Sequence, residues 1–79
     1  MKVWIKNGPK GSQIKKGEVF KLELESNLKK DPINFEAKEV SSKKIRFGVL
    51  IIFKGIISNG ENVHGNVLAH EKIPFLEYS

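Results

Sequence analysis

The chain has no cysteine among its 79 residues. This absence excludes a disulfide framework, a thiolate nucleophile and a cysteine-ligated metal site. A chain without cysteine also fits the reducing interior of a cell. We therefore expect a cytoplasmic protein.

Long hydrophobic runs are missing as well. The longest apolar run, residues 47–53, is far shorter than the roughly 20 residues that a membrane-spanning helix needs. The first residues, MKVWIKNG, lack the apolar core of a signal peptide. We expect one small soluble domain over residues 1–79, with a single core and no membrane contact.

Arginine occurs once, as Arg46, whereas lysine is abundant. The net charge is +5, and residues 1–54 hold thirteen of the fourteen basic groups against six of the nine acids. Such an uneven basic surplus indicates an anionic partner. Because base edges are usually read by arginine, a lysine-dominated surplus favours contact with a nucleic-acid backbone without sequence preference. Lysines that keep a strand-rich protein soluble and protect its sheet edges would give the same composition.

Groups that organise catalysis are scarce and scattered. Residues of the types that act as nucleophiles or bases are Ser41, Ser42, Ser58, His64, His70 and the single aspartate, Asp31. No motif gathers them. His64 and His70 lie six residues apart, which is about 20 Å along an extended strand and too far for one metal ion. We therefore expect no enzyme, no metal site and no cofactor.

Alternation of apolar and polar residues is the dominant pattern of the chain. In residues 18–26, EVFKLELES, Phe20, Leu22 and Leu24 share one face, which is typical of a half-buried strand. Similar alternation predicts strands over residues 2–6, 33–37 and 63–69, while residues 45–53 are apolar on both faces after Arg46. Three of the phenylalanines fall in apolar phase and are predicted core residues: Phe20, Phe35 and Phe47.

Turn signals divide these strands. Asn59–Gly60 predicts a hairpin, residues 41–44 (SSKK) read as another hairpin connection, and Val40 falls out of phase, which predicts a bulge near residues 38–40. Pro74 restricts the last segment to an edge or terminal strand. Together these patterns predict an all-β fold, a small antiparallel barrel or sandwich of five to six short strands, with at most one helical turn, at residues 26–30.

The segment from Gly8 to Lys16, GPKGSQIKK, resembles the GxxG loop with which KH domains clamp a nucleic-acid backbone. A KH loop opens onto a helix, whereas Gly17 and an alternating strand follow here, so no KH fold is predicted. The segment is therefore interpreted as a basic loop whose lysines meet phosphate without specificity. A plain connection between two strands is the alternative.

These observations predict a non-catalytic binding module that contacts the nucleic-acid backbone through a lysine-rich face. The predicted nucleic-acid-binding residues are Trp4, Lys10, Lys15, Lys16, Lys43, Lys44 and Arg46, where Trp4 stacks on bases and the others meet phosphates. The alternative is a protein–protein interaction module, such as a small inhibitor or accessory protein of a mobile element, that acts through a sheet edge or an exposed apolar patch. Because a barrel covers only one face of residues 49–53, either Leu50 and Ile52 or Val49, Ile51 and Phe53 turn outward. We predict a homodimer, or a partner complex, that buries the outward face, with Leu50 and Ile52 as the predicted interface residues.

Overall fold

The computed structural model describes residues 2–25 and 32–79, so the helical turn expected at residues 26–30 lies outside the described part. The described residues form six strands and one turn of 3-10 helix, η1. Their bounds are β1 Lys2–Asn7, η1 Gly11–Gln13, β2 Val19–Leu24, β3 Ile33–Ile45, β4 Gly48–Ile57, β5 Asn62–Leu68 and β6 Phe75–Tyr78. The predicted all-β class is confirmed. The described residues contain no helix that is long and apolar enough to cross a membrane.

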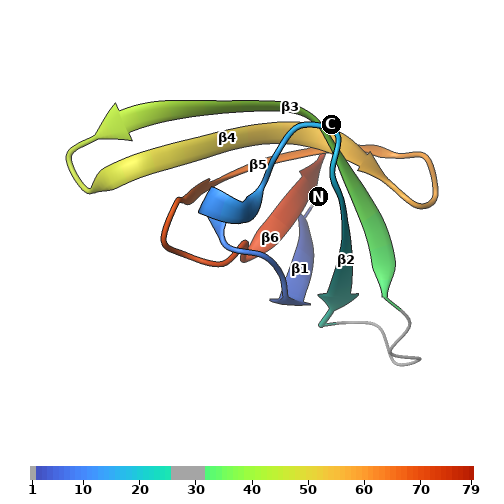
Figure 1. Cartoon of the computed structure of the whole chain (residues 1–79). Coiled ribbons are helices and arrows are strands. Elements are labelled where there is room, and N and C mark those ends of the chain that lie inside the picture. Colours follow the sequence, from blue (N-terminus) through green and yellow to red (C-terminus); the bar gives the residue numbers. More distant parts are fainter. Residues whose placement is uncertain (1, 26–31) are drawn as a thin grey trace.

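Each strand pairs antiparallel with the next along the chain, and β6 returns to pair with β1, so that the sheet closes into a barrel (Figure 1). The closing register places Val3 opposite Leu76, while Ile5 lies opposite Leu24 of β2. These four side chains face the interior because alternate residues of a strand point to the same side. Because the sheet closes, β6 has a paired strand on both sides. Pro74 had indicated only that this segment is an edge or terminal strand.

The barrel interior is filled by side chains in the predicted phase. Leu22 and Phe35 are fully buried, and the rings of Phe35 and Phe53 meet edge to face with their centroids 5.7 Å apart. Gly55 lies beside this pair, and a Cβ atom there would stand 2.7 Å from the Phe35 ring and 2.1 Å from the carbonyl oxygen of Glu36. A glycine is therefore required where β4 passes the bulged part of β3 and the Phe35 ring.

The hairpin between β3 and β4 corrects two sequence-based predictions. Residues 41–44 are not a connection but part of β3, paired with β4 up to Ile45 opposite Gly48. The turn consists of Arg46 and Phe47, and Gly48 follows it with a φ of +130°, a conformation that side chains rarely allow. Phe47 is consequently not in the core: 74% of its surface is exposed. The predicted bulge is confirmed between Ala37 and Glu39.

Residues 40–53 of this hairpin, which we call the arm, extend away from β1, β2 and β6 (Figure 1). The arm makes the molecule elongated, with principal dimensions of 39 × 21 × 20 Å. On one side β5 pairs with β4 as far as Leu50. On the other side β2 follows β3 only to Ala37, and among the described residues no further strand pairs with β3 beyond it. The arm therefore has one free edge.

Candidate nucleic-acid interface

The basic loop, residues 8–17, crosses one open end of the barrel at the base of the arm. At one side the Ser12 amide donates a hydrogen bond to the carbonyl of Ala69 (2.9 Å), just past β5, and at the other side the Gly17 amide donates to the carbonyl of Ala37 on β3 (2.8 Å). Ile14 between them is buried and belongs to the core. This anchor holds the backbone in place while Lys15 and Lys16 remain exposed.

The turn η1 fixes the start of the same loop. The Lys10 amide donates to Oε1 of Gln13 (2.9 Å), and the Gln13 amide donates to the Lys10 carbonyl (2.9 Å). Lys10 also forms an isolated bridge with Lys72, and its own side chain is exposed. The predicted connection between two strands is therefore an ordered loop whose three lysines face solvent.

The arm carries the other three predicted cations on different sides. Lys44 lies opposite Val49, on the face that holds Ile51 and that turns toward the basic loop. Lys43 lies opposite Leu50, on the outward face. Arg46 occupies the turn at the tip, and all three side chains are exposed.

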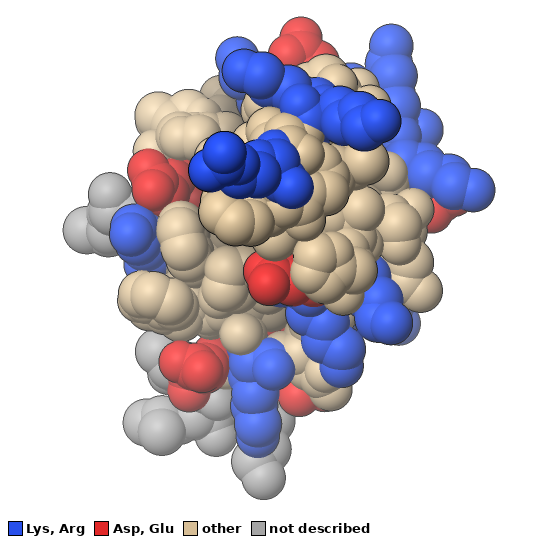
Figure 2. Space-filling view, turned by 90° about the vertical axis from the view of Figure 1, so that its left-hand side faces the viewer, with Lys and Arg blue, Asp and Glu red and all other residues tan. Residues whose placement is uncertain are grey.

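Loop and arm are neighbours because Ala69, the residue after β5, is hydrogen-bonded to both. The Ala69 carbonyl accepts from Ser12 of the loop, and the Ala69 amide donates to the Val49 carbonyl on the arm (2.8 Å). Val49 in turn lies opposite Lys44. Figure 2 faces the tip of the arm and shows Lys and Arg side chains around a largely uncharged surface, with less acidic than basic surface. The fold thus places the basic loop alongside the arm, with Lys15 and Lys16 near Ala37 at its base and Arg46 at its tip, roughly 30 Å farther along β3.

Acidic residues are absent from both segments. Residues 8–17 hold three lysines and the arm holds two lysines and one arginine, with no Asp or Glu in either. Together the two segments carry a charge of +6. Because the net charge of the chain is +5, the remaining residues sum to −1. Within the described residues, an ion pair joins Lys38 with Glu36, and His64 and His70 lie 3.7 and 4.0 Å from the carboxylates of Glu77 and Glu71. None of these contacts includes a cation of the loop or arm.

The outer surface of the barrel is balanced in charge. Register places Glu39, Lys54, His64, Glu77 and Lys2 in one row across five strands. Opposite charges on neighbouring strands stabilise a sheet, by roughly 0.2–1 kcal/mol per pair. The basic surplus is therefore confined to the loop and arm rather than spread over the barrel.

Trp4 lies apart from the six cations. It is 51% exposed on the outer face of β1, and its ring packs against Phe75 of β6 with centroids 5.2 Å apart. Lys2 Nζ lies over both rings, 4.4 Å from the Phe75 centroid and 5.9 Å from that of Trp4. Within the described residues β1 contacts β2 and β6 but neither strand of the arm. The structure does not bring Trp4 together with the predicted phosphate contacts.

One polar contact was not foreseen from the sequence. His64 Nδ1 lies 3.0 Å from Ser79 Oγ, and His64 Nε2 lies 3.7 Å from Glu77 Oε2. The β5–β6 register, with His64 opposite Glu77, brings these groups together, and nothing in the sequence spacing announces it. The side chains of His64 and Glu77 are about 40% exposed, so the contact lacks the water-excluded setting in which such a set performs catalysis. In residues 2–25 and 32–79 no group of three His, Asp or Glu side chains is placed to hold a metal ion.

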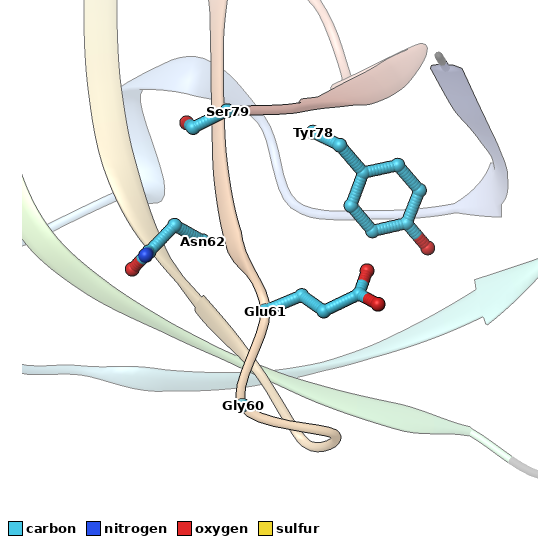
Figure 3. Close-up of a pocket in the computed structure, with 5 residues that line it drawn as sticks. All are labelled: Gly60, Glu61, Asn62, Tyr78 and Ser79. Carbon is cyan, nitrogen blue, oxygen red and sulfur yellow. The ribbon is translucent and has the colours of Figure 1, made fainter.

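A shallow pocket of about 490 Å³ opens beside β6, lined by Gly60, Glu61, Asn62, Tyr78 and Ser79 (Figure 3). The Tyr78 hydroxyl faces the Glu61 carboxylate and donates a hydrogen bond to it. Burial, and then the charge and hydrogen bond of Glu61, raise the pKa of Tyr78 above its ordinary value of 10.0. A neutral phenol bonded to a carboxylate supports the loop after β4 and offers no reactive group at neutral pH.

The predicted interface residues lie where the barrel geometry requires. Of the two possible faces of β4, Ile51 and Phe53 are buried, whereas Leu50 and Ile52 turn outward. Leu68 of β5 lies opposite Leu50 on the same outward face, so a small apolar strip runs beside the free edge of β3.

Searches of family models, curated proteins and solved structures find no match to this chain. Its function is therefore inferred from these surfaces.

Proposed function

We propose that the chain is a non-catalytic binding module whose basic loop and arm contact the phosphate backbone of nucleic acid. One observation carries this proposal: two acid-free segments far apart in the sequence lie next to each other in the fold, and their six cations account for the whole basic surplus. Phosphate groups are the strongest attraction for such a surface. A cytoplasmic location belongs to the same proposal.

Five of the six cations are lysines, which act as point charges rather than as forks that read base edges. Binding without sequence preference and with a strong dependence on salt follows. If all six cations neutralise phosphates of a single strand, log Kd changes with log salt concentration with a slope of about 4.

The test is fluorescence anisotropy of a labelled oligonucleotide titrated at several salt concentrations. The variant Lys15→Ala/Lys44→Ala removes one cation from the loop and one from the arm. The matched control, Lys6→Ala/Lys21→Ala, removes the same charge from exposed positions on β1 and β2. The loop–arm variant should bind more weakly and lose about 1.4 from the salt slope, because each phosphate contact to a single strand accounts for about 0.7. Equal losses in both variants would show that only net charge matters and would refute the proposed interface.

A protein–protein interaction module is the second candidate function, and the free edge of β3 beside the outward strip of Leu50, Ile52 and Leu68 favours it. In this case we expect a homodimer that buries the strip, since two-fold pairs are the commonest soluble oligomers. Ile52→Lys should then produce a monomer that keeps the fold, as measured by analytical ultracentrifugation and circular dichroism. A wild-type chain that stays monomeric at about 100 μM, well above the Kd of a stable pair, would exclude the homodimer.

A further inference from the structure

Phe47 is a large aromatic side chain held in water at the tip of the arm. Its surface is 74% exposed, and it is the most exposed of the large hydrophobic residues in the described part of the chain. Exposure of an aromatic ring forfeits the free energy that its burial would contribute. The sequence pattern had assigned the residue to the core, and the two-residue turn places it outside.

The backbone of the turn places this residue at the end of the arm. The ladder between β3 and β4 continues to Ile45 opposite Gly48, so only Arg46 and Phe47 lie beyond the last pair. Gly48, with its φ of +130°, lets the chain reverse within these two residues. A short turn on a paired hairpin keeps the ring near the end of the arm and leaves its faces open.

The charges around Phe47 identify the kind of partner. Arg46 precedes Phe47 in the turn, and Lys43 and Lys44 lie farther back on β3. Residues 40–53 contain no acidic residue. An apolar protein surface would have to desolvate these cations, whereas a nucleic acid pairs them with phosphates. An aromatic ring among cations is the arrangement with which proteins bind single strands, because rings stack on bases while the cations follow the backbone.

We propose that Phe47 stacks on an unpaired base of a single-stranded nucleic acid whose phosphates are held by the arm and the basic loop. This inference rests on the proposed function and names its substrate class. Inside a duplex each base is already stacked on both sides, so that only the two terminal base pairs offer Phe47 a free face. Trp4, on another side of the barrel with Lys2 over its ring, takes no part in this contact.

The experiment compares Phe47→Ala, Phe47→Trp and wild type on two fluorescent probes. These are an oligothymidine of about 15 nucleotides, near the upper site size of a small barrel, and a blunt duplex of the same length. Phe47→Ala should weaken binding to oligothymidine about 5- to 150-fold and weaken binding to the duplex far less. Its salt slope should equal that of wild type because no cation is removed, and Phe47→Trp should retain the affinity.

A spectroscopic readout tests the contact directly. In the variant Trp4→Phe/Phe47→Trp the single tryptophan lies at the tip, and its emission should be quenched when oligothymidine stacks on it. The emission of Trp4 in the wild-type chain should not change. Thermal unfolding of Phe47→Ala should match that of wild type because the side chain is exposed.

The two proposals can fail separately. If Phe47→Ala binds oligothymidine as wild type does, while Lys15→Ala/Lys44→Ala binds weakly, the stacking role is wrong and the phosphate interface stands. Equal losses on single strand and duplex would also overturn the stacking role. If the wild-type chain binds neither probe at low salt, both proposals are wrong.

Discussion

Two adjacent isoleucines of β4 provide a matched test of which face the barrel buries. Ile51 is 8% exposed and belongs to the core, whereas Ile52 is 38% exposed and turns outward. Both residues are isoleucine in the same strand, both are paired with β3 and β5, and both lie in the arm. Replacing each with alanine therefore makes the same chemical change on opposite faces.

The expected magnitudes follow from burial. Ile→Ala removes three carbon groups, which account for about 2.4 kcal/mol at roughly 0.8 kcal/mol for each buried group. At Ile51 the cavity left among the core residues adds to this loss, and we expect a decrease in unfolding free energy of about 3 kcal/mol. At Ile52 more than a third of the side chain is already in water and no closed cavity forms, so we expect a decrease of about 1 kcal/mol.

The assay is urea denaturation followed by far-ultraviolet circular dichroism, at two protein concentrations so that any dimer dissociation is detected. A chain of this size has only a few kcal/mol to lose, so Ile51→Ala should be close to unfolded without urea. A larger loss for Ile52→Ala would mean that the assigned phase of β4 is inverted and that the outward strip is part of the core. Equal losses would mean that both faces of β4 are equally buried, which would also refute the assigned difference.

Two further predictions concern the core and the pocket. Gly55→Ala should lower the unfolding free energy by at least about 1–3 kcal/mol, measured by the same assay, because its Cβ would overlap the Phe35 ring and the Glu36 carbonyl; wild-type stability would refute the close packing. Tyr78 is the single tyrosine, so its near-ultraviolet absorbance should titrate above pH 10, and Glu61→Gln should lower its pKa. Because the folded pKa is raised, this group stabilises the fold below about pH 10 and the contribution is lost as pH rises through the folded value; titration of Tyr78 at its ordinary pKa would show that the contact with Glu61 is absent.

Most of the barrel could be predicted because its strands are half-buried. Leu22, Phe35 and Val63 point inward in strands whose alternate residues are polar, and this periodicity is visible without any knowledge of the partners. The Asn59–Gly60 turn and the bulge near Lys38 were also marked by local features of the sequence. What the sequence did not decide was closure, since pairing of β1 with β6 joins the two ends of the described chain.

The arm could not be predicted by the same reasoning. Ser41 to Lys44 form a polar run that is typical of a turn, yet they continue β3, because pairing with the apolar β4 is enough to hold them in a strand. Phe47 was assigned by its hydrophobicity, although the turn leaves it no neighbour to pack against. Sequence periodicity reports which face of a strand is buried but not how far two paired strands extend beyond the barrel.

The free edge of β3 explains part of the basic surplus without any ligand. Lysines beside an unpaired edge discourage association with other strands, and Lys43 and Lys44 stand at this edge. The same explanation does not reach Lys10, Lys15 and Lys16, which lie on a loop anchored by Ser12, Ile14 and Gly17 and offer no strand to protect. Either positive or negative charges would protect the edge, whereas the charged residues of both segments are all cations. A common sign on two segments that are neighbours only in the folded chain supports the proposed anionic partner. The loop lysines, more than those of the arm, therefore distinguish the proposed phosphate binding from protection of the sheet edge.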